Sequence, residues 1–450
     1  MEFTSIILAA GMGTRMKSKL PKVLHKICGK ELAAWVIDAS KNAGAERVCT
    51  VIGHCADKVK DALGDKCEYA LQTEQKGTGH AVMQATDFIG TYTVVLNGDA
   101  PLITSDMIKN AVRRHAESGN SATVITAVFD NAAGYGRIIR AEDGSVLGIV
   151  EEKDASPEQK KIREINSGMY VFNGADLLSA LSGLTPDNAQ GEYYLTDTLS
   201  ILLSEGKKIG AYTVEDNDEI RGINDRLQLN EAERIMQKRL IENHMRDGVT
   251  FILPETTIIE DNVEIGNDTV IYPNVYISSG SKIGSDCLIG SGTQISASTV
   301  ANGVSIKSSV LLDCFIGEGT TVGPYAYIRP DTRVGKHARI GDFVELKNSV
   351  IGDDTKVSHL TYVGDSDVGE RVNFGCGTVT VNYDGKKKYR TVIGNNCFIG
   401  CNTNLVAPVE IKDGGYTAAG STITDEVPEN NLAIARARQV NKSKWKDKRK

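Results

Sequence analysis

The feature that most constrains this chain is an apolar residue that returns at every sixth position from Leu253 to about Ile423. The repeat changes phase near residues 300–303 and is interrupted at residues 382–390. A period of six fits neither an α-helix, with about 3.6 residues per turn, nor a strand, which alternates every 2 residues. It is typical of a parallel β-helix, in which each hexad forms a short strand and a turn and stacks on the next coil. A β-sandwich would need two-residue alternation, so the hexads disfavour it.

The composition is that of a soluble globular protein, with 41% hydrophobic and 24% charged residues among 450. The formal net charge is -7, so no overall field attracts nucleic acid and any phosphate binding must be local. The nine cysteines include no CxxC pair, which favours free thiols in a reducing compartment. Neither a signal peptide nor an apolar run approaching about 18 residues is apparent. We therefore expect a cytoplasmic protein without a membrane span.

Residues 1–222 alternate between strand patterns and helical stripes, which predicts a Rossmann-like, mainly parallel sheet covered by helices. Two polar clusters, Gly11–Arg15 and Asn97–Asp99, each follow a strand, so both should face the crevice off the carboxyl ends of the strands. The first cluster lacks both the third glycine of a dinucleotide fingerprint and the ending of a Walker A loop. With the cations Arg15 and Lys22 it suits the phosphates of a nucleoside triphosphate.

A helix with apolar residues at helical spacing, capped by Asp225, should link the two halves. We therefore predict three segments: a nucleotidyltransferase domain at 1–224, a linker helix at 225–248, and a β-helix with a basic tail at 249–450. The break at residues 382–390 predicts a loop extruded from a corner of the β-helix.

Polar residues interrupt the hexads at Arg329, Lys347 and His359. Arg329 and Lys347 are eighteen positions apart, so a three-sided coil places one above the other. Adjacent like charges are costly unless an anion joins them, which predicts a site for a sugar phosphate; solvated surface charges are the alternative. His359 is the one side chain there that titrates near neutrality.

Specific segments resemble sugar-nucleotide pyrophosphorylases. They are Leu8–Met16, Leu20–Val23, Gln72 with Gly77–His80, Gly134–Ile138, Ile149–Glu151, Ile165–Gly168 and Gly222–Asn224. With the hexads behind them, the whole chain resembles the bacterial bifunctional N-acetylglucosamine-1-phosphate uridyltransferase and glucosamine-1-phosphate acetyltransferase family. The resemblance implies a left-handed β-helix, a homotrimer assembled through it with the extruded loop reaching a neighbour, and synthesis of UDP-N-acetylglucosamine for the cell wall.

For the first half, the resemblance implies that N-acetylglucosamine 1-phosphate attacks the α-phosphorus of UTP, a reaction that needs positioning and charge neutralisation. Asp99 is the candidate Mg²⁺ ligand, to which the resemblance adds Asn224. Arg15 and Lys22 would carry the phosphate charge. The predicted nucleotide and sugar contacts are Leu8, Ala9, Ala10, Gly11, Lys22, Gln72, Gly77, Thr78, Asn97, Gly98, Asp99, Gly136, Glu151, Asn166 and Asn224.

For the β-helix, the resemblance implies that His359 is the general base that deprotonates the amine of glucosamine 1-phosphate, which then attacks acetyl-CoA directly. Glu345 is the candidate to orient the imidazole, and backbone N–H groups near Cys376 the candidate oxyanion site. The predicted amino-sugar contacts are Arg329, Lys347, Tyr362 and Asn373. The predicted acetyl-CoA contacts are Cys376, Asn382, Tyr383, Cys401, Ala419 and Arg436.

Other interpretations stay open at this point. The chain could be a single-activity sugar-1-phosphate nucleotidyltransferase with a structural or regulatory β-helix, or a binding scaffold without activity. Cys376 or Cys401 could form an acyl-enzyme beside the thioester. The tail after Arg436 either helps to draw in the CoA phosphates or is simply solvated. Its basic residues include Lys442, Lys444, Lys446, Lys448, Arg449 and Lys450.

Overall fold

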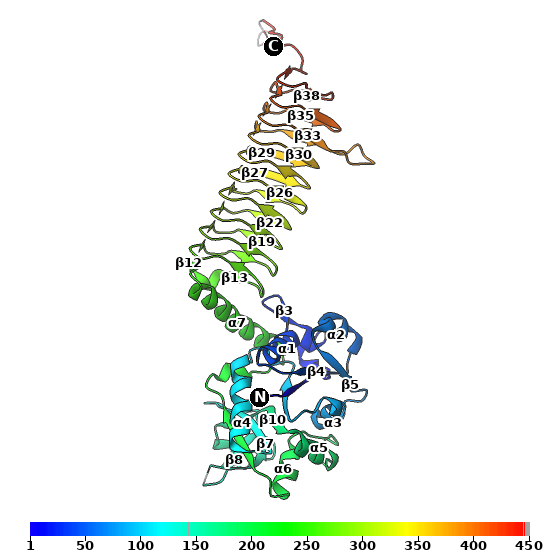
Figure 1. Cartoon of the computed structure of the whole chain (residues 1–450), viewed down its shortest axis with the longest axis vertical. Helices are drawn as coiled ribbons and strands as arrows, with labels where there is room; N and C mark the ends of the chain where they lie inside the picture. Colours follow the sequence, from blue (N-terminus) through cyan, green and yellow to red (C-terminus); the bar gives the residue numbers. More distant parts are fainter. Residues whose placement is uncertain (143, 189, 444, 446–450) are drawn as a thin grey trace. The chain divides into compact units, whose positions relative to one another are not determined.

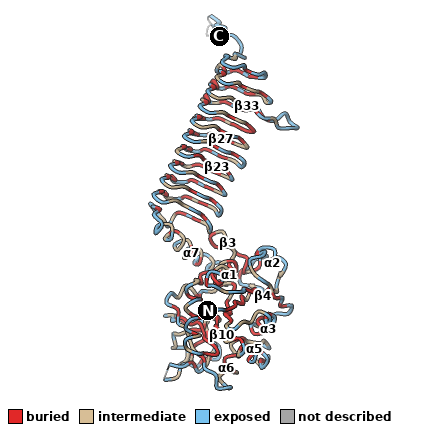
Figure 2. The backbone as a smooth tube through the Cα atoms, viewed as in Figure 1, coloured by how far each residue is buried: buried red, intermediate tan, exposed pale blue. Residues whose placement is uncertain are grey.

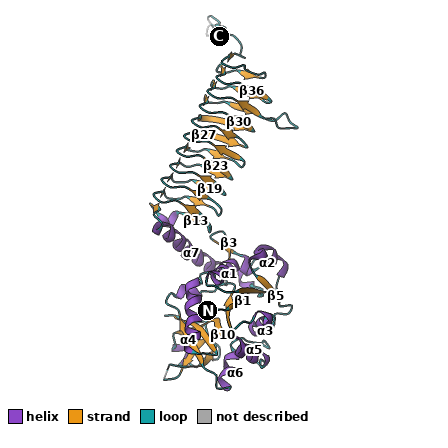
Figure 3. Cartoon of the chain, viewed as in Figure 1, coloured by secondary structure: helices purple, strands orange, loops and turns teal. Residues whose placement is uncertain are grey.

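The structure is a computed structural model that describes residues 1–142, 144–188, 190–443 and 445. It divides into two compact units, Met1–Met236 and Gln237–Lys450. The division falls inside helix α7 (Arg226–Arg246), the helix that was predicted as the linker. Figure 3 shows helices and strands in the first unit, and strands and loops in the second apart from its share of α7. No helix of the described residues is long and apolar enough to cross a membrane.

The first unit is built on a mainly parallel sheet. In spatial order its main strands are β11 (Ile209–Thr213), β7 (Ala122–Val128), β10 (Glu164–Asn173), β6 (Tyr92–Asn97), β1 (Thr4–Leu8), β4 (Arg47–Ile52) and β5 (Glu68–Leu71). Only β10 runs antiparallel to its neighbours along this path of described strands. Beside it lie the hairpins β8 (Arg137–Arg140) with β9 (Val146–Val150) and β2 (Lys26–Ile27) with β3 (Lys30–Glu31).

Helices cover both faces of this sheet. They are α1 (Leu32–Asn42), α2 (Ala56–Leu63), α3 (Thr78–Met83), α4 (Ser105–Ser118), α5 (Gly174–Ser182) and α6 (Asp197–Ser204). Successive residues of β1 point to opposite faces, because side chains alternate along a strand. Ile6 therefore packs in one core with Val82 of α3 and Leu177 of α5. Ile7 packs in the other core with Val36 of α1. Because both faces of the sheet are buried, the sequences of its parallel strands are continuous apolar runs.

The second unit is the predicted parallel β-helix, a stack of coils in Figure 1. One of its sheets contains β12 (Thr250–Phe251), β13 (Ile258–Ile259), β15 (Val270–Ile271), β16 (Tyr276–Ile277), β18 (Leu288–Ile289), β19 (Gln294–Ser296), β21 (Ser305–Ile306), β22 (Val310–Leu312), β24 (Thr321–Val322), β25 (Tyr327–Ile328), β27 (Arg339–Lys347), β29 (Lys356–Gly364), β31 (Asn373–Phe374), β32 (Val379–Val381), β34 (Phe398–Ile399), β35 (Asn404–Val406), β37 (Tyr416–Thr417), β38 (Thr422–Ile423) and β39 (Leu432–Ala433). The other contains β14 (Glu264–Ile265), β17 (Lys282–Ile283), β20 (Thr299–Val300), β23 (Cys314–Ile316), β26 (Thr332–Val334), β28 (Val350–Ile351), β30 (Ser366–Val368), β33 (Thr391–Ile393) and β36 (Val409–Ile411).

The hexad residues form the core of this unit. Ile259, Ile277, Ile295 and Ile328 are fully buried and belong to one continuous cluster along the stack. Figure 2 shows buried segments recurring in each coil. A single hexad cannot bury its own apolar side chain, so each coil depends on the coils above and below it.

Asp225 caps the start of helix α7 as the sequence predicts. The side chain of Asp225 accepts hydrogen bonds of 2.9 Å from the backbone N–H groups of Leu227 and Gln228. At the other end Ile241 joins the apolar core of the β-helix. Gln237 exchanges side-chain hydrogen bonds with the backbone of Ile259. The carboxyl-terminal part of α7 therefore covers apolar residues that the first coils leave open.

The predicted extruded loop lies between β32 and β33, where Figure 1 shows it projecting from the stack. Tyr383 and Lys388 form an isolated antiparallel bridge within it. The backbone N–H groups of Lys386 and Lys387 donate to the carboxylate of Asp384 at its turn. The insertion lengthens one coil, and the register resumes with Asn373 opposite Phe398.

Candidate functional sites

A cavity of about 690 Å³ lies at the carboxyl ends of β1 and β6 in the first unit. The crevice predicted from the strand pattern is therefore present, and most of the predicted nucleotide contacts line it. These are Leu8, Ala9, Ala10, Gly11, Arg15, Lys22, Gln72, Gly77, Thr78, Asn97, Asp99 and Asn224. Gly98 lies between them, and its N–H donates to the carbonyl of Leu8 across the β1–β6 pair.

The two predicted metal ligands, Asp99 and Asn224, both line this cavity. Lys22 forms an ion pair with Asp99, and its Nζ also lies 3.3 Å from Oδ1 of Asn224. Arg15 donates to the same amide oxygen at 2.8 Å. The carboxylate oxygen and the amide oxygen therefore share one cation, the ammonium of Lys22, and the amide oxygen also contacts Arg15. The N–H of Ile223 donates to the carbonyl of Asp99, which ties the segment carrying Asn224 to the end of β6.

The predicted sugar contacts Gly136, Glu151 and Asn166 do not belong to the described lining, but they gather beside it. The N–H of Asn166 donates to the carbonyl of Gly136 at 2.9 Å. A Cβ atom on Gly136 would lie 3.2 Å from Oε1 of Glu151. Their chain neighbours Tyr135 and Ser167 do line the cavity. Burial raises the pKa of Glu151, and the charges of nearby aspartates add to this shift.

Sequence reasoning missed one wall of this cavity, the segment that carries Glu192 and Tyr194. Backbone hydrogen bonds of 2.8 Å join Tyr193 to Gly79 and to Lys76, on either side of Gly77–Thr78, the segment predicted to contact the nucleotide. No motif marks these residues, because their place depends on pairing between distant loops. A Cβ atom on Gly77 would lie 2.5 Å from the carbonyl oxygen of Tyr193, and Gly77 has φ +102, so this close approach requires glycine.

A second cavity, of about 550 Å³, lies on the β-helix. It is lined by Arg329, Pro330, Asp331, Lys347, Asn348, Asp365, Lys388, Tyr389 and Arg390. Arg329 and Lys347 share one face as predicted, because Ile328 pairs with Leu346 in the preceding position. Each has a carboxylate partner: Arg329 lies 2.8 Å from Glu345 and Lys347 lies 3.4 Å from Asp365.

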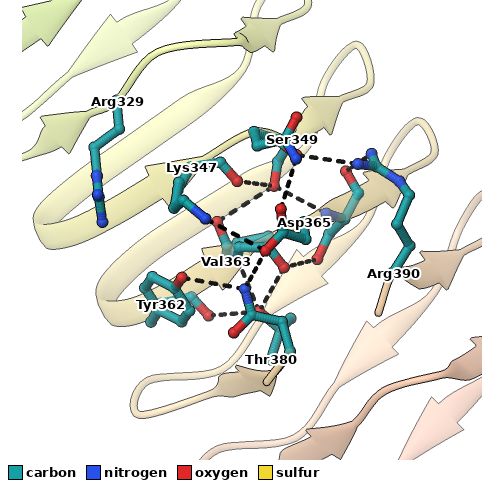
Figure 4. A network of polar contacts seen from close by, with 12 residues as sticks. Arg329, Lys347, Ser349, Tyr362, Val363, Asp365, Thr380 and Arg390 are labelled. Carbon is teal, nitrogen blue, oxygen red and sulfur yellow. Dashed lines mark hydrogen bonds and ion pairs between the residues drawn. The ribbon is translucent and has the colours of Figure 1, made fainter. Parts of the chain in front are cut away.

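Asp365 is the centre of the polar network drawn in Figure 4. Its carboxylate accepts hydrogen bonds from Asn348, Asn382 and Lys347, and only 6% of its side chain is exposed. Burial alone would raise the pKa of this carboxyl, but the two amide donors and the Lys347 ammonium outweigh it and the pKa is lowered. The network joins the first residue of the extruded loop, Asn382, to Lys347.

The loop also brings a further cation to this cavity. Lys388 lies close to Lys347, and the side-chain contact with Lys347, followed by the positive charge of Lys347, lowers the pKa of Lys388. Arg390 is held by a two-point ion pair with Asp367. Four cations thus line one cavity together with few carboxylates, an arrangement suited to an anion with several oxygens.

His359 lies on β29 at a corner of the coil, outside the described lining of this cavity. Its Nδ1 lies 2.7 Å from Oδ1 of Asp342, and the prediction that Glu345 orients the imidazole is wrong in this structure. The reason is register: Asp342 pairs with His359 across β27 and β29, whereas Glu345 pairs with Tyr362. Glu345 therefore lies on the next face, where it meets Arg329.

The other predicted residues of the β-helix occupy nearby coils. Extending the observed register places Cys376, Cys401 and Ala419 at the same corner as His359. Both cysteines are free and exposed. Asn382 donates to the hydroxyl of Tyr362 at 3.3 Å.

The remaining predicted contacts lie on the same coils or the last ones. Asn373 begins β31, and the exposed Tyr383 donates from its hydroxyl to the carbonyl of Gly385. The side chain of Arg436 lies beside Gly420, next to Ala419. Of the tail residues named above, Lys442 is described; Lys444, Lys446, Lys448, Arg449 and Lys450 lie outside the described residues.

The fold and the sites define a nucleotidyltransferase joined to a hexapeptide-repeat transferase. Residues 4–231 match the nucleotidyl transferase family. Residues 262–297, 313–348 and 390–425 match the bacterial transferase hexapeptide family. Three relatives carry the name bifunctional protein GlmU. That of Acetivibrio thermocellus is 56% identical over 98% of this chain and 96% of its own length. That of Clostridium perfringens is 56% identical over 100% of this chain and 100% of its own length. That of Caldanaerobacter subterraneus is 52% identical over 100% of this chain and 98% of its own length.

The chain therefore belongs to the bifunctional GlmU family. The predicted family, fold class and bifunctional transferase activity are confirmed. The alternatives of a single-activity nucleotidyltransferase and of a binding scaffold lose their support, since the relatives named bifunctional match over nearly the whole chain.

Proposed function

We propose that this protein makes UDP-N-acetylglucosamine in two steps. Glucosamine 1-phosphate first receives an acetyl group from acetyl-CoA, and N-acetylglucosamine 1-phosphate then receives a uridyl group from UTP with release of pyrophosphate. The observation that carries the proposal is the pairing of sites in one chain. One cavity gathers Lys22, Asp99 and Asn224, and the other gathers Arg329 and Lys347.

In the uridyl transfer, a phosphate oxygen of the sugar attacks the α-phosphorus of UTP, and the bond to the leaving pyrophosphate breaks. Arg15 and Lys22 lie where they can neutralise the phosphates in the first cavity. Gln72 and the backbone of Gly77–Thr78 would contact the uracil edge, and the group around Gly136 and Asn166 the sugar.

Magnesium fits this cavity by the chemistry of its oxygens. The oxygens of Asp99 and Asn224 already meet at one cation, the ammonium of Lys22. No group of three or more His, Cys, Asp or Glu side chains in the described part of the chain could hold a metal ion. Two protein ligands completed by substrate phosphates and water suit Mg²⁺, which keeps much of its hydration. When bound, it would offset the negative charge of the triphosphate.

In the acetyl transfer, Nε2 of His359 takes a proton from the amine as the nitrogen attacks the thioester carbonyl. The new C–N bond forms, the C–S bond breaks, and CoA leaves as the thiol after taking up a proton. Arg329 and Lys347 would hold the sugar phosphate, with Tyr362 and Asn373 beside it. Asn382, Tyr383, Ala419 and Arg436 would contact acetyl-CoA.

We expect the acetyl-transfer site to be completed in a homotrimer. Tyr325, Phe343 and Leu360 form an exposed apolar column at the same corner of three consecutive coils, with exposed fractions of 62%, 58% and 60%. The rings of Tyr325 and Phe343 stack at 5.5 Å. Such an apolar column on a folded surface favours a protein partner. Leu360 directly follows His359, so a neighbouring chain that covers the column would also border the imidazole.

The cytoplasm is the compartment that suits this chemistry. All the cysteines that the structure describes are free, including Cys376 and Cys401 at the surface. Exposed thiols near a thioester substrate persist in a reducing compartment.

The proposal is tested by assaying the purified protein in the two half-reactions separately. Pyrophosphate release with UTP, Mg²⁺ and N-acetylglucosamine 1-phosphate measures uridyl transfer. CoA thiol release with acetyl-CoA and glucosamine 1-phosphate measures acetyl transfer. We expect both, and omission of Mg²⁺ should abolish only the first. Absence of thiol release from a folded trimer would overturn the acetyl-transfer assignment.

A further inference from the structure

The imidazole of His359 has a carboxylate partner in the adjacent coil. We propose that Asp342 is the positioning residue of acetyl transfer: it holds the imidazole of His359 with Nδ1 protonated and Nε2 free to accept the proton of the amine. This inference rests on the proposed role of His359 as general base and assigns a further residue to that reaction.

The geometry of the pair follows from the register of the β-helix. Asp342 on β27 and His359 on β29 are direct partners in a parallel ladder. Each precedes a residue with positive φ, Phe343 at φ 57 and Leu360 at φ 38, so both corners turn in the same way. The two side chains therefore leave adjacent coils in parallel, and their polar atoms meet at 2.7 Å. This is the length of a charge-assisted hydrogen bond.

The strands that carry the pair are unusual for this β-helix. β27 and β29 each contain nine residues and continue through the corner, whereas most other described strands of this unit contain two or three. A corner paired continuously on both sides holds its side chains more firmly than a free turn. The His359 hydrogen bond lowers the pKa of Asp342, so this carboxyl is ionised at neutral pH.

Other charged or titratable groups near the pair do not replace Asp342. Arg339, on the same strand, adds a further lowering of the Asp342 pKa by its charge. Glu345 is bound to Arg329 on the next face. The coil that follows places the thiol of Cys376 at the same corner as His359.

The chemical consequence concerns the tautomer. A neutral imidazole carries one N–H donor and one acceptor nitrogen, and the hydrogen bond of one nitrogen decides the role of the other. With Nδ1–H donating to Asp342, the lone pair lies on Nε2. After Nε2 takes the amine proton, the imidazolium lies beside a carboxylate that stabilises it. Serine proteases use a buried aspartate in the same way.

A surface ion pair of the same unit provides the matched control. Lys336 and Glu318 approach to 3.3 Å on neighbouring coils, with side chains 58% and 55% exposed. Pairs of this kind contribute little to stability. Glu318→Gln removes one carboxylate from the β-helix without touching His359, and it should leave both activities unchanged.

Three variants separate orientation from charge. Asn at position 342 can still accept a hydrogen bond from Nδ1–H but carries no charge. Ala neither accepts this hydrogen bond nor carries a charge. We expect Asp342→Asn to lower kcat of acetyl transfer about 10-fold and Asp342→Ala about 100-fold. KM for glucosamine 1-phosphate should change by less than about twofold, because the residue does not bind the sugar. The acid limb of the kcat/KM profile should move to lower pH in Asp342→Asn, and Asp342→Glu should restore part of the rate.

His359→Ala, assayed alongside, distinguishes the general-base role of His359 from the positioning role of Asp342. If His359→Ala retains acetyl transfer, the general-base assignment fails. If His359→Ala loses it while Asp342→Ala and Asp342→Asn behave like Glu318→Gln, with unshifted pH profiles, only the role of Asp342 is overturned. Uridyl transfer and the elution volume of each variant report whether the chain is folded and assembled. If Asp342→Ala fails to fold, Asp342→Asn and Asp342→Glu still decide the question.

Discussion

The two candidate sites differ in how the fold shelters them. In the first unit Lys22 and Asp99 have side chains only 17% exposed, in a cavity formed by several loops at one edge of a sheet. On the β-helix His359 and Asp342 are 55% and 39% exposed, on the outside of a coil. A sheet edge can surround a ligand with loops of one chain, whereas a coil presents its side chains outward. The first site is therefore preorganised by burial, and we expect the second to need its ligand and the proposed neighbouring chain to exclude water.

The largest expected effect separates the two sites completely. Asp99→Ala should reduce uridyl transfer by about 10³-fold or more, because it removes the charged ligand of the proposed metal, and should leave acetyl transfer intact. His359→Ala should do the reverse. Pyrophosphate and CoA release measured on the same preparations check both. A variant that silences both reactions while remaining a folded oligomer would show that the sites are not independent.

A second prediction tests whether a neighbouring chain covers the exposed site on the β-helix. Tyr325→Glu places a charge in the exposed apolar column, two coils from His359, and should weaken the trimer. Acetyl transfer should fall about 10-fold or more at low protein concentration and recover at high concentration, while uridyl transfer stays constant. Light scattering over the same concentrations measures the assembly. Loss of the trimer with undiminished acetyl transfer would mean that one chain suffices for this site.

Thiol chemistry should also distinguish the regions. Cys376 and Cys401 are exposed at the corner that carries His359, whereas Cys49 is buried and its pKa is raised to about 12. Thiolates are the reactive form, so N-ethylmaleimide should modify the exposed pair first. Acetyl transfer should then slow several-fold more than uridyl transfer, and Cys376→Ala with Cys401→Ser should be resistant yet active. An inactive but folded double variant would instead favour an acyl-enzyme.

The smallest expected effect concerns two carboxyls whose pKa values move in opposite directions. The pKa of Asp365 is lowered, so its ionisation stabilises the β-helix above its unfolded pKa, and this contribution is lost as the pH falls through the folded pKa. The pKa of Glu151 is raised, chiefly by burial, so its ionisation at neutral pH costs stability in the first unit.

Asp365→Asn should therefore lower Tm at pH 7 by about 2 °C or more, and Glu151→Gln should raise it by a similar amount. The Asp365→Asn difference should shrink only as the pH falls through the lowered folded pKa of Asp365, whereas the Glu151→Gln difference should disappear below the ordinary pKa of a glutamate, about 4.3. Calorimetry from pH 3 to 7 provides the measurement. If Glu151→Gln destabilised the protein at pH 7, the assigned sign of its pKa shift would be incorrect.

Local patterns predicted the elements of this molecule well. The hexads predicted the β-helix, and the eighteen-residue spacing correctly placed Arg329 above Lys347. Asp225 caps the predicted linker helix. These predictions succeeded because each depends on residues that are near neighbours in sequence or repeat at a fixed interval.

Sequence reasoning failed where a partner depends on pairing between distant segments. Glu345 was predicted to meet His359 but meets Arg329, since the register places Asp342 opposite the imidazole. The role of Asp365 at the centre of its network was likewise missed, because its partners Lys347 and Asn348 lie on the coil before it and Asn382 on the coil after it. Glu192 lines the cavity of the first unit without any motif that marks it.

The sequence by itself determined which architecture each half can form, because periodicity decides which side chains can be buried together. It also determined the cations and the imidazole available for two transfer reactions. Only the tertiary structure decided which carboxylate meets which cation. A shift of a single residue in coil register moves a side chain to another face, and no local pattern records that register. The pairing of Asp342 with His359 is the clearest product of that choice.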